Sequence, residues 1–418
     1  MKIRTIILAG GEGKRLGVLT AKRAKPAVPF AGKYRIIDFT LSNCTNSNLF
    51  DVVLIAQYRP HSLIEHIGVG GPWDLNREFT GGIRIFTPYK SRGADWFIGT
   101  ADAVQQNFGF LKNGNPDLLL ILSADHIYTM DYLPMIQFHL EHQAELTIAT
   151  IQVPLEEASR YGVLGIGENQ RIISFIEKPE KPPFCTVNMG VYLFNTSLLD
   201  KVLWEDHLKA DSAHDFGKNV LPALVNGGAR VFAYPFSGYW MDVGTVESYW
   251  QSHIDLLGSS PALDLYNRSW IIHTRSEERP PAAIQRSAII EDSLICDGCV
   301  IERGAQVIRS VLSPGVIISE GSVIKESIIL TNSTVQKNVS LERSIIDKKV
   351  NLGEGSSIGG VLPDELLIAM VGKSSIIPPF LTIQAGGVIG PDVIPSDIST
   401  PNIKKGEFVQ TRRLPYEI

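Results

Sequence analysis

The sequence contains no apolar run long enough to cross a bilayer. A transmembrane helix needs roughly 20 consecutive apolar residues, and no stretch of the 418 residues approaches that length. The apolar segment Ile6–Ala9 is too short for the hydrophobic region of a secretion signal, and it leads directly into a glycine-rich loop. These absences predict a cytoplasmic protein with no membrane partner.

A basic excess is also missing. The chain has 39 Lys and Arg residues against 44 Asp and Glu residues, which gives a formal net charge of −5. Proteins that bind nucleic acids use clustered positive charge to contact phosphates, so we do not expect this class of function. We expect instead a small-molecule substrate whose phosphate groups are bound by a few local cations.

Cysteine is scarce, with four residues in the whole chain. Only Cys296 and Cys299 have the spacing of metal ligands, and no second pair complements them. A structural zinc site needs about four ligands. We therefore predict that these two cysteines pack inside a repeat and bind no zinc.

The apolar residues divide the chain into two halves with different periodicities. The length of the chain also favours two domains. In the first half, short β-branched runs alternate with segments of helical pattern, such as Ala101–Leu111 and Tyr132–His142. Most runs are continuously apolar, as in strands covered on both faces, so we predict a doubly wound α/β domain with a mixed or parallel sheet. The predicted strands are Ile3–Leu8, Val52–Ile55, Leu118–Leu122, Leu146–Ile151, Ile172–Ile176 and Val191–Phe194.

The second half has a period of six residues. Apolar residues recur at every sixth position in phased runs, with slips between the runs and an interruption around residues 362–373. This spacing is typical of a hexapeptide parallel β-helix, in which each coil buries its apolar row against the next. The expected inward positions are Ile289, Ile295, Ile301, Val307, Val311, Ile317, Val323, Ile329, Val335, Leu341, Ile346, Leu352, Ile358, Ile377, Ile383 and Ile389.

These patterns predict three parts: a catalytic domain over residues 1–257, a linker over 258–283 that is rich in serine and proline, and a β-helix over 284–418. Many hexapeptide-repeat proteins are acyltransferases that use a histidine, but residues 284–389 contain none. We therefore expect the β-helix to serve in assembly and regulation.

A glycine-rich loop, LAGGEGKRL at residues 8–16, follows the first predicted strand directly. Ligands of doubly wound sheets bind at the carboxyl ends of strands, and glycines let exposed N–H groups approach an anion. The loop lacks the Walker A pattern and the third glycine of a dinucleotide fingerprint, and a plain turn remains the alternative. Arg15 in this loop and Lys25 shortly after it are candidate phosphate contacts.

Two aspartates are candidate metal ligands. Asp125 follows the apolar strand Leu118–Leu122, and Asp242 lies in a Trp-Met-Asp-Val-Gly turn. Two carboxylates brought together would suit Mg²⁺, which prefers oxygen ligands. For either aspartate alone, a helix cap or a salt bridge in a loop is the favoured interpretation.

Read in order, these motifs resemble those of the ADP-glucose pyrophosphorylase family, and the resemblance covers nearly the whole chain. The motifs that match the family are LAGGEGKRL and KRAKPAVPFAGKYRIIDFTLSN near the start, GTADAV at Gly99–Val104, DHIY at Asp125–Tyr128, FIEKP at Phe175–Pro179, SAHDFG at Ser212–Gly217 and YWMDVGT at Tyr239–Thr245.

The resemblance implies a GT-A-like nucleotidyltransferase domain followed by a left-handed β-helix. It implies formation of ADP-glucose and pyrophosphate from ATP and glucose 1-phosphate with Mg²⁺, which is the committed step towards glycogen or starch. It also implies a homotetramer under the control of a phosphorylated metabolite. A sugar phosphate is already anionic, so the reaction needs positioning and charge neutralisation rather than a general base.

The resemblance also implies roles for individual residues. Catalytic roles fall to Asp125, Arg15, Lys25 and Lys178, and the metal ligands are Asp125 and Asp242. Nucleotide contacts fall to Leu8, Ala9, Gly10, Gly11, Gln57, Gly99, Thr100 and Asp102. Contacts with the sugar phosphate fall to Phe97, Gly162, Glu177, Lys178 and Asn188.

Several positions depart from the family pattern. The family usually has glycine at Ala124, tyrosine at Phe97, a basic residue at Ile98, serine at Asn188 and a basic residue at Met241. Two alternatives therefore stay open. The chain could use another sugar phosphate or nucleotide, since such enzymes share these motifs, or it could be a catalytically weak regulatory subunit that assembles with an active paralogue.

Overall fold

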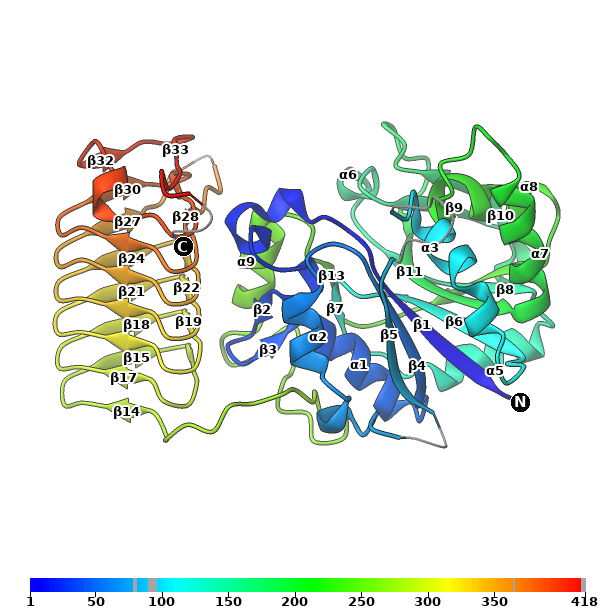
Figure 1. The fold of residues 1–418 in the computed structure, drawn as a ribbon, viewed down its shortest axis with the longest axis horizontal. Coiled ribbons are helices and arrows are strands. Elements are labelled where there is room, and N and C mark those ends of the chain that lie inside the picture. The colour runs from blue at the N-terminus through cyan, green and yellow to red at the C-terminus, as the bar shows by residue number, and fades with distance from the viewer. Residues whose placement is uncertain (78–80, 89–95, 364, 415–418) are drawn as a thin grey trace. The chain divides into compact units, whose positions relative to one another are not determined.

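The computed structural model describes residues 1–77, 81–88, 96–363 and 365–414 (Figure 1). The last four residues of the predicted β-helix, 415–418, lie outside the described residues. The chain forms two compact units. Unit 1 consists of residues 1–11, 37–240 and 269–273, and unit 2 consists of residues 12–36, 241–268 and 274–418.

Unit 1 is built on a mixed sheet of nine described strands. Its main path runs β10-β9-β11-β6-β1-β4-β5, and β8 pairs with both β11 and β12. Strand β1 pairs in parallel with β4 and β6, whereas β11 runs antiparallel to β6. The strands are β1 (Ile3–Ala9), β4 (Asp51–Ala56), β5 (Gly82–Phe86), β6 (Leu118–Ser123), β8 (Leu146–Gln152), β9 (Gly162–Ile166), β10 (Ile172–Glu177), β11 (Thr186–Asn195) and β12 (Val231–Pro235). The short strands β7 (His126–Tyr128) and β13 (Trp240–Asp242) lie outside this sheet.

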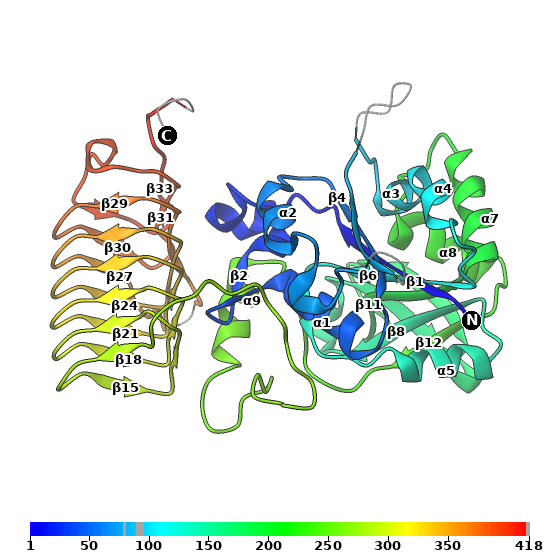
Figure 2. The same cartoon turned by 60° about the horizontal axis from the view of Figure 1, so that its bottom comes forward.

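Helices cover this sheet. Figure 2 shows α3, α4, α7 and α8 on one side of it and α5 on the other, and α5 packs on β8 and β12. No helix in the described part of the chain has the length and apolar character that crossing a bilayer requires. The helical segments are α1 (Ile36–Asn46), α2 (His61–Ile67), η3 (Gly71–Trp73), α3 (Thr100–Gln106), α4 (Phe108–Leu111), α5 (Leu133–Glu141), α6 (Leu155–Ala158), η4 (Glu168–Gln170), α7 (Thr196–His207), the π-helical η5 (Phe216–Val220) and α8 (Leu221–Asn226).

The strand order reverses at β1. From β1 the chain passes through α1 to β4 and β5 on one side, and it later returns to place β6 on the other side of β1. At such a switch point, the loops that leave the carboxyl ends of neighbouring strands diverge, and ligands bind in the crevice between them. The loops after β1 and β6 are therefore where a substrate site is expected in unit 1.

The predicted α/β architecture of the first half is confirmed, and each of the six predicted strands is present. The predicted helix Ala101–Leu111 is split in two, because Asn107 has non-helical backbone angles and its side chain donates to the Ala103 carbonyl at 2.8 Å. Three strands of the nine-stranded sheet were not predicted, β5, β9 and β12. Their burial patterns mix buried and partly exposed positions, or they are broken by glycine, so they lack a long apolar run.

Most of unit 2 is a parallel β-helix. Three parallel sheets form its sides, and equivalent residues in successive coils are 17 apart, as in the pairing of Ile301 with Ile318. This arrangement is consistent with the predicted left-handed hexapeptide β-helix. Its strands are β14 (Ala283–Ile284), β15 (Ile289–Glu291), β16 (Leu294–Ile295), β17 (Val300–Ile301), β18 (Gln306–Ile308), β19 (Val311–Leu312), β20 (Ile317–Ile318), β21 (Val323–Lys325), β22 (Ile328–Ile329), β23 (Thr334–Val335), β24 (Ser340–Glu342), β25 (Ser344–Ile346), β26 (Asn351–Leu352), β27 (Ser357–Gly359), β28 (Ala369–Val371), β29 (Ile376–Ile377), β30 (Thr382–Gln384), β31 (Val388–Ile389), β32 (Asn402–Ile403) and β33 (Phe408–Val409).

The predicted inward positions were wrong by one residue in part of the β-helix. Ile317 is 37% exposed, whereas its neighbour Ile318 is fully buried, and the same holds for the partly exposed Val323 beside the buried Ile324. Ile289 is also exposed. A coil of 17 residues contains two spacings of six and one of five, so a strict period of six drifts out of phase once in every coil.

The predicted interruption near residues 362–373 is real, because Ile345 pairs with Met370 across 25 residues instead of 17. After it, Ile377 and Ile383 return to the buried row. Cys299 packs inside the repeat as predicted, since it is buried and its thiol donates to the Ser313 carbonyl at 3.2 Å, whereas Cys296 is only partly buried.

Two segments from the first half belong to unit 2. They contain η1 (Lys14–Thr20), η2 (Lys25–Ala27), β2 (Pro29–Phe30), β3 (Tyr34–Arg35) and α9 (Val246–Ile254). The Trp250 indole donates to the Glu326 carbonyl at 2.7 Å, and Arg23 forms a buried bidentate pair with Asp347. The border between the units thus does not coincide with the predicted boundary at residue 257, which stays a prediction.

The predicted linker has no helix or strand over residues 258–282. Part of it is nevertheless fixed within unit 1. The Trp270 indole donates to Asn43 Oδ1 at 3.0 Å, and the His273 carbonyl accepts from the Trp73 indole at 3.1 Å.

Candidate active site

The glycine turn and Asp125 leave neighbouring strands of unit 1. Gly10 and Gly11 follow β1, and Ala124 and Asp125 follow β6, with the Ala124 N–H donating to the Leu8 carbonyl at 3.1 Å. Ala9 is buried at the end of β1, whereas Gly11 is exposed. The turn is therefore open to a ligand at the switch point of the sheet.

The Asp125 carboxylate is held by its neighbours but remains accessible. It accepts a hydrogen bond from the Ser123 hydroxyl, and His126 Nε2 lies 3.5 Å from its Oδ1. The His126 ring in turn packs edge-on against Trp240, with ring centroids 5.1 Å apart. Because 28% of the Asp125 side chain is exposed, its oxygens can still reach a ligand.

Gln57 links the glycine turn to the segment before α3. A Cβ atom on Gly10 would lie 3.8 Å from Gln57 Oε1, and Gln57 Nε2 donates to the Phe97 carbonyl at 3.2 Å. The Phe97 side chain itself lies in the hydrophobic core of the unit, with 7% exposure. Asp102 is also buried, and its Oδ2 accepts from the Ile98 N–H at 2.8 Å. Asp102 thus shapes the loop that presents Gly99 and Thr100.

Glu177 lies where two glycines leave room for it. Cβ atoms on Gly162 and Gly217 would lie 2.9 Å and 2.6 Å from its Oε2. Its Oε1 lies 3.2 Å from the ammonium group of Lys178, which is 61% exposed. The Lys178 backbone has φ 46°, and its N–H donates to the Tyr161 carbonyl at 3.0 Å. An amine that can donate to an anion and a carboxylate that can accept from hydroxyl groups therefore lie side by side at the end of β10.

Asn188 is hydrogen-bonded along its own strand. Its amide donates to the Tyr192 hydroxyl at 2.7 Å, and its Oδ1 accepts from the Gly190 N–H at 2.8 Å. Burial raises the pKa of the Tyr192 phenol well above its usual value, so this hydroxyl stays protonated. A side-chain amide has two N–H groups, so Asn188 can donate the other one to a sugar hydroxyl.

Unit 2 contains the other predicted site residues, Arg15, Lys25 and Asp242. Lys25 Nζ lies 3.2 Å from Asp242 Oδ1, and the two side chains are 8% and 19% exposed. A Cβ atom on Gly244 would lie 3.2 Å from Asp242 Oδ2 and 3.3 Å from Arg15 Nη2. Arg15 and Asp242 thus lie close to Gly244, Lys25 pairs with Asp242, and a side chain at Gly244 would press on the first two.

The predicted residues are therefore divided between the units. Unit 1 contains the glycine turn, Asp125, the loop before α3 and the residues around Glu177, and unit 2 contains Arg15, Lys25 and Asp242. Contacts of any of these residues with a ligand stay predictions. Gly217 and Tyr192, which were not predicted, pack beside Glu177 and Asn188. Gly217 could have been found, because it ends the SAHDFG motif.

Two protein families match successive parts of the chain. The nucleotidyl transferase family matches residues 4–259, and the GlmU-like, C-terminal hexapeptide family matches residues 280–365. The first match ends at residue 259, and the second begins at residue 280.

Several curated relatives carry the name glucose-1-phosphate adenylyltransferase. The relative from Pseudothermotoga lettingae is 46% identical over 417 residues, which covers 98% of this chain and 99% of the relative. The relative from Thermomicrobium roseum is 47% identical over 418 residues and 97% of each chain. The relative from Clostridium novyi is 49% identical over 312 residues, which covers 74% of this chain and 81% of the relative. Because similarity at this level spans both the nucleotidyl transferase part and the hexapeptide repeats, the chain belongs to the glucose-1-phosphate adenylyltransferase family.

Proposed function

We propose that this chain forms ADP-glucose and pyrophosphate from ATP and α-D-glucose 1-phosphate, the first committed step of glycogen-type α-glucan synthesis. The observation that carries this proposal is the similarity to the glucose-1-phosphate adenylyltransferase of Pseudothermotoga lettingae. The two sequences are 46% identical over 98% of this chain. The local geometry agrees, because an exposed glycine turn and an accessible carboxylate lie at the switch point of the sheet.

The chemistry proposed for the site is a displacement at the α-phosphorus of ATP. A phosphate oxygen of glucose 1-phosphate forms the new P–O bond, and the bond to pyrophosphate breaks. The nucleophile is anionic and needs no base, so the residues act by positioning and by neutralising charge. Arg15 and Lys25 suit the phosphates of ATP, and Lys178 suits the sugar phosphate.

We propose the following contacts for each substrate. The nucleotide lies against Leu8, Ala9, Gly10, Gly11, Gln57, Gly99, Thr100 and Asp102. The sugar phosphate lies against Phe97, Gly162, Glu177, Lys178 and Asn188. For Asp102 and Phe97 the support is indirect, since both side chains are buried and act by shaping the loop before α3.

We propose that Asp125 and Asp242 hold Mg²⁺. The donor set fits, because both side chains offer carboxylate oxygens with partial exposure, which suits a hard cation. Trp240, which precedes Asp242 by two residues in the sequence, packs against His126, the neighbour of Asp125. When bound, the ion would neutralise negative charge on the phosphates.

The direct test is pyrophosphate release by the purified chain. We expect turnover with ATP and glucose 1-phosphate at roughly 1–1,000 per second, dependence on Mg²⁺, and much lower rates with other nucleotides or sugar phosphates. Preference for another pair would replace the proposed substrates. Absence of turnover would favour the regulatory-subunit alternative, which the change from serine to Asn188 supports.

Asp125→Asn tests the proposed metal ligand. It retains the size of the side chain and the acceptor for the Ser123 hydroxyl, so the fold should persist. Removal of the charge should lower turnover by about 100-fold or more. Normal turnover with unchanged Mg²⁺ dependence would remove Asp125 from the mechanism.

We also propose that the protein works in the cytoplasm as a homotetramer under a phosphorylated-metabolite effector. The presence of a hexapeptide β-helix supports a role in assembly. Sedimentation of the purified chain measures the subunit count, and kinetics with and without phosphorylated sugar intermediates measure regulation.

A further inference from the structure

The turn at residues 212–217, here called the 212–217 turn, contacts both proposed substrate regions of unit 1. It leads from the end of α7 into η5. The family resemblance implies no substrate contact for any residue of this turn, and a structural role is the expectation for His214. Its contacts nevertheless reach the start of α3 on one side and Glu177 on the other.

The first set of contacts fixes the start of α3. The His214 carbonyl accepts from the N–H groups of Ala101 at 2.9 Å and Asp102 at 3.1 Å. These are backbone donors of the first helical turn, which have no partner inside the helix itself. The Thr100 hydroxyl donates to Asp215 Oδ2 at 2.9 Å and accepts from the Phe216 N–H at 3.0 Å.

The second contact fixes Glu177. A Cβ atom on Gly217 would lie 2.6 Å from Glu177 Oε2 and 2.9 Å from Cδ, so the glycine backbone packs directly on the carboxylate. The same turn therefore determines where the loop at 99–102 lies and where Glu177 lies. A shift of the turn would move both.

The turn needs stabilising contacts, because His214 has an unfavourable backbone conformation. His214 has φ 50°, in the left-handed region, which costs a residue other than glycine about 1 kcal/mol. The side chains compensate. His214 Nδ1 donates to Asp206 Oδ2 at 2.9 Å, and the Ser212 hydroxyl donates to Asp206 Oδ1 at 2.7 Å and accepts from the His214 N–H at 3.0 Å.

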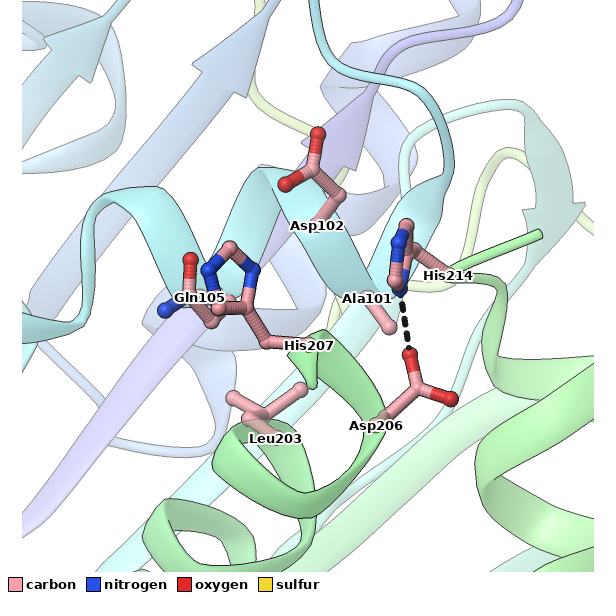
Figure 3. A pocket seen from close by; sticks show the side chains of 7 residues that line it. All are labelled: Ala101, Asp102, Gln105, Leu203, Asp206, His207 and His214. Atoms are coloured by element: carbon pink, nitrogen blue, oxygen red, sulfur yellow. Dashed lines mark hydrogen bonds and ion pairs between the residues drawn. The ribbon is translucent and has the colours of Figure 1, made fainter. Parts of the chain in front are cut away.

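The anchor of this network is rigid. Asp206 is 4% exposed and lies on α7, whose residues Leu199, Val202 and Leu203 belong to the hydrophobic core. Figure 3 shows Asp206 on α7 bonded to His214, beside Ala101 and Asp102 of α3. Both oxygens of the buried carboxylate are thus used to hold the 212–217 turn.

We propose that Asp206 and His214 are positioning residues for the transfer reaction. Their hydrogen bond holds the 212–217 turn so that the loop at 99–102 and the Glu177 carboxylate keep the spacing that the two substrates require. This inference rests on the proposed function, since it takes that loop as the nucleotide site and Glu177 as a sugar contact. Neither residue needs to touch a substrate.

His214→Gly is the informative variant, because glycine adopts the left-handed backbone without strain and removes only the imidazole. Loss of a hydrogen bond to a buried carboxylate should raise the KM for both substrates about tenfold to a hundredfold. Hydrogen exchange of the Ala101 and Asp102 amides should accelerate by a similar factor. His214→Asn should restore both, because asparagine tolerates this backbone and its amide can donate to Asp206.

His207→Ala is the matched control, since His207 lines the same region but is an exposed residue at the end of α7. It should leave both KM values and the exchange rates unchanged. Unchanged KM and exchange in His214→Gly, or a loss that His214→Asn does not restore, would overturn the inference. If the parent chain releases no pyrophosphate, the proposed function fails, and the exchange rates still decide whether His214 holds the start of α3.

Discussion

At the residue scale, Gly162 determines how closely the backbone can approach the Glu177 carboxylate. A Cβ atom there would lie 2.6 Å from Phe175 Cζ and 2.9 Å from Glu177 Oε2. We expect Gly162→Ala to displace the carboxylate and to raise the KM for glucose 1-phosphate about tenfold, since overpacking costs about 1–3 kcal/mol. Kinetics with each substrate varied in turn measure the effect. Gly109→Ala is the control, because a Cβ atom there meets nothing within 4 Å.

The KM for ATP should change little in Gly162→Ala. An unaltered KM for glucose 1-phosphate would contradict the proposed sugar contact at Glu177.

His253 is a second residue whose surroundings predict a measurable effect. Its Nδ1–H donates to the Tyr249 carbonyl at 2.8 Å, and its Nε2 accepts from the Ala31 N–H at 3.1 Å, so the ring must be neutral. Burial lowers its pKa to about 4. The unfolded chain binds the proton first as the pH falls below about 6.5, so this contribution to stability is complete above that pH and declines towards pH 4.

Between pH 7.5 and pH 5.0 we expect His253 to account for a loss of about 2 kcal/mol in the free energy of unfolding. Urea unfolding at the two pH values measures the loss. His253→Gln cannot titrate and should show a smaller difference between them. An equal difference in both proteins would mean that His253 is not held neutral.

At the element scale, the β-helix distinguishes neighbouring isoleucines by the direction of their side chains. Ile318 is fully buried in the stacked row, whereas Ile317 on the same strand, β20, is 37% exposed. We expect Ile318→Ala to cost about 2–5 kcal/mol, because it leaves a cavity that the coils above and below cannot fill. Ile317→Ala should cost under about 1 kcal/mol. Similar losses in urea unfolding would contradict the register described above.

At the scale of the whole molecule, a buried ion pair joins segments that are 324 residues apart. Arg23 Nη1 and Nη2 bond the two carboxylate oxygens of Asp347 at 2.9 Å and 3.0 Å, with exposures of 6% and 0%. Burial, and then the positive charges of Arg35 and Arg23, lower the pKa of the nearby Lys348 to about 8. Asp347 therefore balances several cations within unit 2.

Asp347→Leu should destabilise the protein by about 3–5 kcal/mol, because it leaves Arg23 buried without a partner. Thermal unfolding measures the loss. The double variant Arg23→Met with Asp347→Leu should recover much of it. The exposed pair Arg303 and Glu320 provides the control, since Glu320→Gln should cost under about 1 kcal/mol. A small effect of Asp347→Leu would show that the pair does not stabilise unit 2.

Much of the fold could be predicted from local patterns. Six of the nine strands of the sheet in unit 1 and the β-helix follow from hydrophobic periodicity, which depends only on neighbouring residues. The break at Asn107 could not be predicted, because a side chain that bonds its own helix leaves no signal in the pattern. The five-residue spacing between Ile324 and Ile329 was also missed, since the neighbouring pairs Ile317-Ile318 and Val323-Ile324 fit either register.

The candidate site was predictable where a motif follows a strand. The glycine turn and Asp125 lie at the switch point of the sheet, where the strand pattern places them. The bonds that position these groups were not predictable. Asp206, which no motif marks, holds the 212–217 turn only because α7 ends beside it.

By itself, the sequence determined the types of elements, their order and the kinds of chemical group available to a phosphate-transfer site, because each of these depends on residues close together in the chain. Only the tertiary structure decided which distant side chains meet, such as Thr100 with Asp215 and Arg23 with Asp347. The physical reason is that such contacts depend on the path of the backbone and on strand register. A shift of one residue in strand register moves each side chain of the strand to the opposite face of the sheet.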